Sequence, residues 1–237
     1  MSAAAVELRD LRLRWPSAGA DCLAIDRFEL GAGERVFLQG PSGSGKSTLL
    51  ALIGGVLAPT AGYISVAGQV LGALSSSARD RFRADHIGFI FQLFNLLPYL
   101  SARDNILLPC RFSAARRERL QRAGCTPDEE VLRLAEHLDL PPELLARRAS
   151  ELSVGQQQRV AAARALIGGP GLVVADEPTS ALDADRQAAF LDLLQGECAA
   201  SGAALLFVSH DPRLSARFDR VLNLADINHA AGAGAGS

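Results

Sequence analysis

The sequence has almost no lysine, few cysteines and no long apolar run. Lys46 is the only lysine among the 237 residues, and the other residues of the basic count are arginines. No charge-free apolar run reaches the roughly 18–20 residues that a membrane-spanning helix needs, so we expect a soluble chain. The four cysteines form no C-x-x-C pair, which is typical of buried or incidental thiols in a reducing compartment and supports neither disulfides nor a zinc site. They are Cys22, Cys110, Cys125 and Cys198.

The chain also lacks a basic charge balance and a leader segment. Its net charge is −2 and its pI is about 6.1, which argues against broad nucleic-acid binding. The first ten residues hold no basic segment followed by an apolar stretch, so we expect no secretory signal. A length of 237 residues fits one large domain, or a domain with a modest appendage.

Residues 40–48 are the strongest motif in the chain. They match the phosphate-binding pattern G-x-x-x-x-G-K-S/T, in which glycines let successive backbone N–H groups converge on a polyphosphate. Lys46 would reach the outer phosphates as a compact point charge. A helix from Ser47 to about Ile53 would direct its N-terminal dipole at the anion, with the Ser47 hydroxyl on a magnesium ion. The candidate ligand residues of this loop are Gly40, Pro41, Ser42, Gly43, Ser44, Gly45, Lys46, Ser47 and Thr48.

Alternating apolar residues precede this loop. Residues 6–14, 22–30 and 34–39 predict an antiparallel set of strands that leads into Gly40. Trp15, the only tryptophan, ends the first of them. Two interpretations of Trp15 stay open: an aromatic residue in the core or at a sheet edge, or a flat platform on which an adenine ring stacks.

Polar residues follow three apolar stretches that we interpret as buried strands. Gln92 follows residues 86–91, and its amide oxygen could touch a metal ion or a metal-bound water at the carboxyl end of a strand. Asp176 and Glu177 follow residues 172–175, where Asp176 would hold a hydrated metal and Glu177 would orient or deprotonate a water. His210 follows residues 203–209 and could contact a γ-phosphate, although a lone histidine is often structural.

Residues 93–150 predict a helical subdomain inserted into an α/β core made of residues 1–92 and 151–229. Thr126 opens a capping box, so a helix should run from there to about Leu138. Five arginines cluster in this segment, and we interpret them as a solvated helix face or as a contact for anionic headgroups or an acidic partner. They are Arg111, Arg116, Arg117, Arg119 and Arg122. The tail, residues 230–237, has no core-forming residues and is expected to be disordered.

A second capping box joins Ser153 to Gln156, three residues later. It predicts an exposed helix N-terminus, and therefore a second potential anion site.

Together these motifs resemble the nucleotide-binding subunit of an ATP-binding-cassette (ABC) system, from Val6 to about Leu224. The features that agree in order are Trp15, the loop at 40–48, Gln92, the signature Leu152–Gln156, the Asp176-Glu177 pair with the Ser-Ala-Leu-Asp stretch that follows at 180–183, and His210. The resemblance implies an α/β fold: a P-loop ATPase core with a mixed and parallel sheet, flanking helices, an N-terminal antiparallel β part and the inserted helical subdomain.

The resemblance also implies roles for these residues. Two subunits would form a head-to-tail homodimer, in which the Ser153, Gly155 and Gln156 signature of one completes the ATP site of the other. The cofactors would be ATP and Mg²⁺. Glu177, His210 and Lys46 would be catalytic, and Ser47, Gln92 and Asp176 would hold the metal.

Within the family, the motifs at 49–55, 91–98, 104–109 and 156–159 are similar to those of the lipoprotein-releasing, macrolide-export and FtsE-type ATPases. That subgroup implies a separate membrane permease of the FtsX or MacB kind, docking near residues 93–110, with the ATPase in the cytoplasm on the inner face of the membrane and no nucleic-acid partner. A polar amino-acid importer subunit is the nearest alternative. A soluble repair or translation ATPase is disfavoured because the chain lacks sustained heptads and a second cassette, and a non-hydrolysing regulatory cassette because Glu177 and His210 are present.

One position departs from the family signature L-S-G-G-Q, because Val154 replaces its first glycine. A β-branched residue fits the start of a helix if its φ is negative. We therefore expect slower or retuned hydrolysis rather than loss.

Overall fold

The computed structural model describes residues 4–16, 19–180 and 182–230. Its first part is an antiparallel sheet in the order β2-β1-β4-β5, made of β1 (Val6–Leu13), β2 (Leu23–Leu30), β4 (Ala61–Val66) and β5 (Gln69–Val70). Alternate residues of β1 are buried, as expected for a sheet with one face in the core. The antiparallel strands predicted at residues 6–14 and 22–30 are confirmed.

A second sheet of parallel strands forms the centre of the molecule. Its order is β6-β7-β8-β3-β9, made of β6 (Ile87–Ile90), β7 (Leu172–Asp176), β8 (Ala204–Val208), β3 (Arg35–Gln39) and β9 (Arg220–Asn223). The prediction that residues 34–39 belong to the antiparallel set is wrong, since β3 pairs in parallel with β8 and β9. The physical reason is visible in its burial: three consecutive residues of β3 are buried, which suits a strand covered on both faces.

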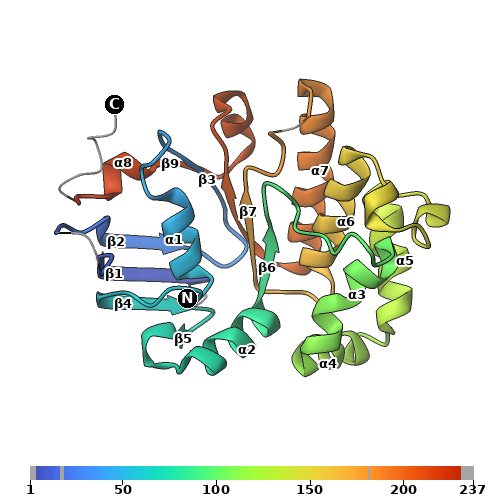
Figure 1. The fold of residues 1–237 in the computed structure, drawn as a ribbon, viewed down its shortest axis with the longest axis horizontal. Coiled ribbons are helices and arrows are strands. Elements are labelled where there is room, and N and C mark those ends of the chain that lie inside the picture. Colours follow the sequence, from blue (N-terminus) through green and yellow to red (C-terminus); the bar gives the residue numbers. More distant parts are fainter. Residues whose placement is uncertain (1–3, 17–18, 181, 231–237) are drawn as a thin grey trace.

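Helices cover this sheet. They are α1 (Lys46–Ile53), α2 (Ser76–His86), α3 (Ala102–Phe112), α4 (Ala114–Arg122), α5 (Pro127–His137), α6 (Val154–Leu166), α7 (Ala184–Ser201) and α8 (Leu224–Ile227). Three of them, α3, α4 and α5, lie beyond the β6 end of the sheet (Figure 1). Short 3-10 helices lie at Leu71–Ala73, Pro142–Leu144, Ala149–Glu151 and Pro212–Arg217. The antiparallel sheet lies at the left of Figure 1 and α3, α4 and α5 at the right, with β6 and β7 between them.

Both predicted capping boxes are present. The Thr126 side chain accepts from the Glu129 N–H at the start of α5, and the Ser153 side chain accepts from the Gln156 N–H at the start of α6. Each glutamate or glutamine side chain in turn accepts from the N–H of its cap residue. These caps place the α6 N-terminus where the sequence predicts it.

The parallel sheet separates two hydrophobic cores. Phe37 and Phe207 face a core shared with α3, α5, α6 and α7, whereas their neighbours Val36 and Leu206 face a core shared with α1 and the antiparallel sheet. Since residues 93–150 share the first core with α6 and α7, the division into 1–92, 93–150 and 151–229 stays a prediction. Of the tail expected to be disordered, residues 231–237 lie outside the described residues.

The arginine cluster is not the solvated face that the sequence suggests. Arg116 is only 2% exposed, and Arg119 is half-buried, donating to the Gly168 and Asp85 carbonyls. Only Arg111, Arg117 and Arg122 are exposed. The interpretation as a solvated face is wrong for Arg116 and Arg119, because their partners are backbone carbonyls in or next to α2, β6 and α6, which are distant in the sequence.

Within the described ranges, no helix is both long enough and apolar enough to cross a membrane.

Candidate functional site

The loop at 40–45 joins β3 to α1 and is shaped by glycine. Gly45 has φ +100°, and a Cβ there would lie 2.8 Å from Cδ2 of Leu23. Gly43 also has a positive φ, of +77°. A left-handed backbone and close contact with β2 exclude other side chains at Gly45, so the loop takes the tight conformation expected of a phosphate cradle.

The Lys46 side chain folds back onto the start of this loop. Its Nζ donates to the Gly40 carbonyl at 2.7 Å and to the Pro41 carbonyl at 2.9 Å. The ammonium group is thus held beside the loop by weak neutral acceptors, which an anion can replace.

The loop forms one wall of a cavity of about 470 Å³. That volume falls within the range of about 300–1,000 Å³ typical of small-molecule sites. The ends of three parallel strands line the same cavity: Asp176 is the last residue of β7, and Gln92, Glu177 and His210 follow β6, β7 and β8. The lining residues are Gly40, Ser42, Gly43, Gly45, Lys46, Ser47, Thr48, Gln92, Asp176, Glu177 and His210. Of the predicted loop ligands, Pro41 and Ser44 do not line it, and Ser44 is buried with no hydrogen-bond partner for its Oγ in the described part of the chain.

The two carboxylates at the end of β7 differ in environment. Burial, followed by the charge of Glu177, raises the pKa of Asp176, while Lys46 and Ser47 act in the opposite direction. Glu177 has φ +44°, a conformation that costs a residue with a side chain about 1–2 kcal/mol. Its N–H donates to the Val208 carbonyl at 2.9 Å, which holds this backbone against β8. Strain of this kind clusters at functional sites.

His210 contacts Glu177 directly. The Nδ1 of His210 lies 3.2 Å from Oε2 of Glu177, and both side chains line the cavity. The arrangement fits a carboxylate that is oriented by the imidazole while it faces bound water or phosphate.

Trp15 lies just beyond β1 and is 42% exposed, so it is not a core residue. It does not line the cavity, but the end of β1 and β2 that carries it adjoins the loop. The Cys22 N–H donates to the Leu13 carbonyl at 2.8 Å, and the Cys22 carbonyl lies close to Gly45. The role of Trp15 as a stacking platform for adenine stays a prediction.

The signature residues lie elsewhere. Ser153, Gly155 and Gln156 line a different cavity, of about 460 Å³, which shares no lining residue with the first. Val154 is the first residue of α6 and is exposed, so a β-branched side chain is accommodated at that position. The structure of one chain therefore does not bring the signature to Lys46.

Sequence reasoning missed Asn228, which is 5% exposed and follows α8. Its Oδ1 accepts from the Ala24 N–H at 2.9 Å, and its Nδ2 donates to the carbonyls of Cys22 at 3.2 Å and Ser44 at 3.4 Å. Asn228 thereby ties the phosphate loop to β2. No motif marks it, because its partners at Cys22, Ala24 and Ser44 are more than 180 residues away in the sequence.

Comparisons with known proteins agree with this geometry. A family model described as "ABC transporter" matches residues 23–180. The chain is 45% identical over 200 residues to the lipoprotein-releasing system ATP-binding protein LolD of Anaeromyxobacter dehalogenans, covering 83% of this chain and 80% of that protein. It is 42% identical over 230 residues to LolD of Novosphingobium aromaticivorans, covering 94% of this chain and 97% of that one.

The chain is also 39% identical over 230 residues to the macrolide export ATP-binding/permease protein MacB of Chromobacterium violaceum, covering 95% of this chain but only 34% of that relative. It thus spans about a third of the MacB length. Among solved structures, a dimeric ATP-binding cassette in a post-hydrolysis state, bound to ADP and Pi, is similar with a TM-score of 0.79 and 31% identity, covering 92% of this chain and 93% of that one.

Proposed function

This chain belongs to the ABC transporter family of ATPases, and we propose that it is the ATP-hydrolysing subunit that energises a separate membrane permease of the LolD- or MacB-associated kind. The observation that carries the proposal is the cavity between the phosphate loop and the strand ends that present Gln92, Asp176, Glu177 and His210. A polar amino-acid importer subunit is disfavoured by the relatives just described.

ATP binds through the loop and the start of α1. Backbone N–H groups and the helix N-terminus face the phosphates, and Lys46 exchanges its carbonyl partners for phosphate oxygens. Glu177 orients the attacking water and accepts its proton, while His210 holds the Glu177 carboxylate and contacts the γ-phosphate. Charge on the transferred phosphoryl group is stabilised by Lys46 and by loop N–H groups that are already in position.

The residues present also fit Mg²⁺. Ser47, Gln92 and Asp176 offer hydroxyl, amide and carboxylate oxygens, which are the hard ligands that this ion takes. In the described parts of the chain, no group of three or more His, Cys, Asp or Glu could hold a metal. With Asp176 as the carboxylate ligand, the remaining positions on such an ion would be taken by water and substrate phosphates. When bound, the ion would neutralise charge on the phosphate oxygens.

A second copy of this chain completes the site. The Ser153 helix N-terminus is exposed and lies in a cavity separate from that of Lys46, and a relative of 31% identity is solved as a dimer. We infer a head-to-tail homodimer in which Ser153 and the Gly155 backbone face the γ-phosphate of the opposite subunit. Gln156 contributes mainly by capping, since its Oε1 already accepts from the Ser153 N–H at 2.9 Å.

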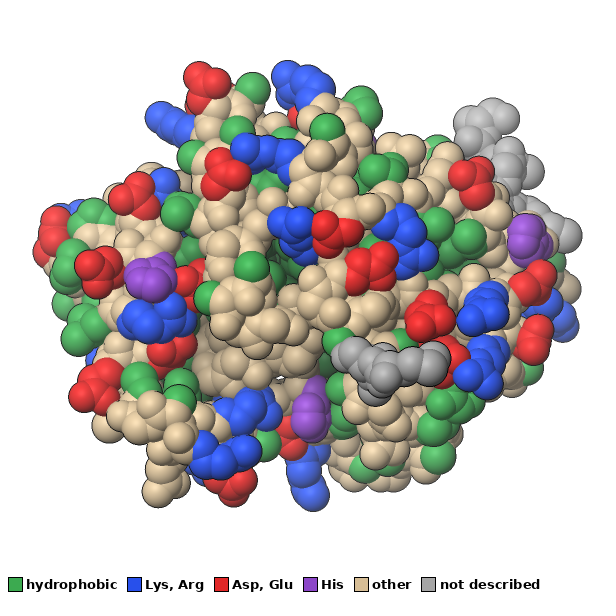
Figure 2. Space-filling model, turned by 180° about the vertical axis from the view of Figure 1, so that it is seen from behind, with side chains coloured by type: hydrophobic (Ala, Val, Ile, Leu, Met, Phe, Trp, Pro, Cys, Tyr) green, Lys and Arg blue, Asp and Glu red, His purple; other side chains and the backbone are tan. Residues whose placement is uncertain are grey.

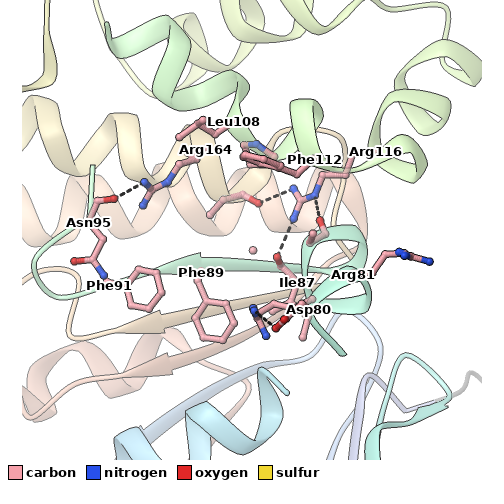
Figure 3. Close-up of a pocket in the computed structure, with 15 residues that line it drawn as sticks. Asp80, Arg81, Ile87, Phe89, Phe91, Asn95, Leu108, Phe112, Arg116 and Arg164 are labelled. Carbon is pink, nitrogen blue, oxygen red and sulfur yellow. Dashed lines mark hydrogen bonds and ion pairs between the residues drawn. The ribbon is translucent and has the colours of Figure 1, made fainter. Parts of the chain in front are cut away.

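An apolar groove beside the ATP cavity fits the permease. Figure 3 shows it between β6 and α3, with Phe89, Phe91, Leu108 and Phe112 facing it. Its volume is about 570 Å³. Phe112 is 77% exposed, and Leu93 nearby in sequence is 83% exposed. The occupant that this surface fits is a short cytoplasmic segment of the permease with apolar side chains, which would place the chain on the inner face of the membrane. The docking region predicted at 93–110 is extended here to Phe112 and to four residues of α2: Asp80, Arg81, Arg83 and Ala84.

The surface charge argues against a nucleic-acid partner. Acidic and basic side chains are intermixed over the face shown in Figure 2, and the net charge is −2. A nucleic-acid-binding surface is typically a continuous basic patch.

The testing experiment is capture of the permease with Glu177→Gln protein and ATP from solubilised membranes, because blocked hydrolysis should hold the closed dimer on its partner. We expect a permease with few spans and a large extracytoplasmic domain, and no capture without ATP. Phe112→Asp in the same background should lose the permease but keep the ATP-dependent dimer. Recovery of a many-span importer permease, or of no membrane protein, would contradict the proposal.

A further inference from the structure

The turn after β6 has an unusual backbone. Phe94 and Asn95 have φ of +57° and +49°, so two consecutive residues with side chains are left-handed. For Phe94 this costs about 1–2 kcal/mol relative to the right-handed region, whereas asparagine adopts the left-handed conformation more readily. The turn is closed by the Phe94 N–H, which donates to the Phe91 carbonyl at 2.9 Å. A conformation of this cost persists only where the surrounding structure supports it.

Burial supports only part of this turn. Phe94 is buried, but Gln92, Leu93 and Asn95 are exposed. The next segment has its own anchor, the fully buried Asn105, which accepts from the Leu97 N–H at 2.8 Å and donates to the Leu97 carbonyl at 3.1 Å. Inside the turn, the Asn95 N–H also donates to the Leu93 carbonyl at 2.6 Å, and Leu96 packs against the first core. The backbone at Phe94 and Asn95 is tied to another element by a side-chain contact.

That contact is Arg164, near the end of α6. Its Nη1 donates to the Asn95 carbonyl at 2.7 Å and its Nη2 to the Phe94 carbonyl at 2.5 Å, and Figure 3 shows the guanidinium directed at Asn95. In the described part of the chain, these are the only side-chain hydrogen bonds to the backbone of residues 91–95. Two adjacent carbonyls match the planar fork of an arginine, which a single ammonium cannot reproduce.

The helix that carries Arg164 is fixed to the strand that leads into the turn. A Cβ on Gly88 of β6 would lie only 2.3 Å from the Ala165 carbonyl oxygen, so α6 and β6 are in direct backbone contact. Arg164 extends this contact past the end of β6. Within the turn, Gln92 lines the ATP cavity, whereas Phe91 and Asn95 line the apolar groove.

We propose that Arg164 is a positioning residue for ATP hydrolysis: by holding the Phe94 and Asn95 carbonyls it keeps Gln92 in the ATP cavity and links the signature helix α6 to that glutamine. The proposal rests on the ATPase function argued above. Arg164 lines the apolar groove and does not line the ATP cavity, so it acts on Gln92 through the turn.

Hydrogen exchange of the nucleotide-free protein tests the contact itself. We expect Arg164→Met to speed exchange in residues 92–96 about ten-fold, because the left-handed turn loses its support. Arg164→Lys should give a smaller change. The matched control is Arg220→Met, which removes an arginine that pairs with Glu34 and the Glu29 carbonyl at another site. Unchanged exchange at 92–96 in Arg164→Met would overturn the proposal.

A double-mutant cycle on ATP turnover tests whether Arg164 acts through Gln92. We expect Arg164→Met to lower kcat about ten-fold in the native background but less than about two-fold in a Gln92→Ala background. Equal reductions in both backgrounds would mean that Arg164 acts by another route. Absence of ATP turnover in the wild type would instead contradict the proposed ATPase function. The hydrogen-exchange experiment would then still decide whether Arg164 holds the turn.

Discussion

Replacing Arg116 by methionine should be among the most destabilising changes in the chain. The guanidinium is 2% exposed and donates four hydrogen bonds to backbone carbonyls at 2.5–3.2 Å. These carbonyls belong to Ala84, Ile87, Ala165 and Ile167. They lie at the ends of α2 and α6 and at the start of β6, where carbonyls at helix C-termini favour a positive charge. Burial lowers the pKa of Arg116 to about 10, so the group stays charged at neutral pH.

The magnitude follows from two opposing effects. Hydrogen bonds to a charged group contribute about 1.5–3 kcal/mol each, so four contribute about 6–12 kcal/mol. Burying the guanidinium offsets several kcal/mol of this. Methionine removes the charge but leaves four carbonyls without this donor, and an unsatisfied buried acceptor costs about 1–3 kcal/mol. We therefore expect Arg116→Met to lower the free energy of unfolding by about 3–5 kcal/mol, a large part of the 5–15 kcal/mol of an ordinary domain.

Urea denaturation of the nucleotide-free protein at pH 7 measures this loss. Arg122→Met is the matched control, since Arg122 is exposed on the same helix, and it should change the free energy of unfolding by less than about 0.5 kcal/mol. Arg116→Lys should fall between the two, because an ammonium cannot reach four divergent carbonyls. A loss below about 1 kcal/mol for Arg116→Met would refute the reasoning.

Three further predictions concern the ATP site. Trp15→Ala should weaken ATP binding by about 1–3 kcal/mol, measured by titration with a fluorescent nucleotide, whereas Trp15→Tyr should retain most of the affinity; equal affinity for all three proteins would exclude stacking. Asn228→Ala should raise the KM for ATP about five-fold with a smaller change in kcat, because the Ser44 carbonyl loses its tie to β2, and an unchanged KM would argue against that tie. Because burial and the Glu177 charge raise the pKa of Asp176, the native state binds its proton more tightly than the unfolded chain, and the contribution of Asp176 to the free energy of unfolding should fall as pH rises from about 4 through the native pKa. Glu177→Gln should lessen that fall in urea titrations, and identical pH slopes would contradict the assignment.

Local patterns made much of the fold predictable from the sequence. Alternation predicts β1 and β2, apolar runs predict β7 and β8, and the two capping boxes predict the starts of α5 and α6. The pattern at 40–48 and the polar residues after three strands locate the cavity, because carboxyl ends of parallel strands meet at one edge.

The rest depends on partners that are distant in the sequence. Residues 34–39 hold only a run of three apolar residues, which is too short to decide between the two sheets, and the choice is made by pairing with β8 and β9. Arg116, Arg164 and Asn228 look like surface residues in the sequence, yet each bonds backbone carbonyls of other elements. The left-handed backbone of Glu177 was equally hidden, since no glycine marks it.

ATP turnover of the wild type beside Glu177→Gln tests the central claim most directly. The account predicts that the wild type hydrolyses ATP and that Glu177→Gln binds ATP but turns it over at least about 100-fold more slowly, since it loses the carboxylate that accepts the proton of the attacking water. Equal rates in the two proteins, or no hydrolysis by the wild type, would contradict it.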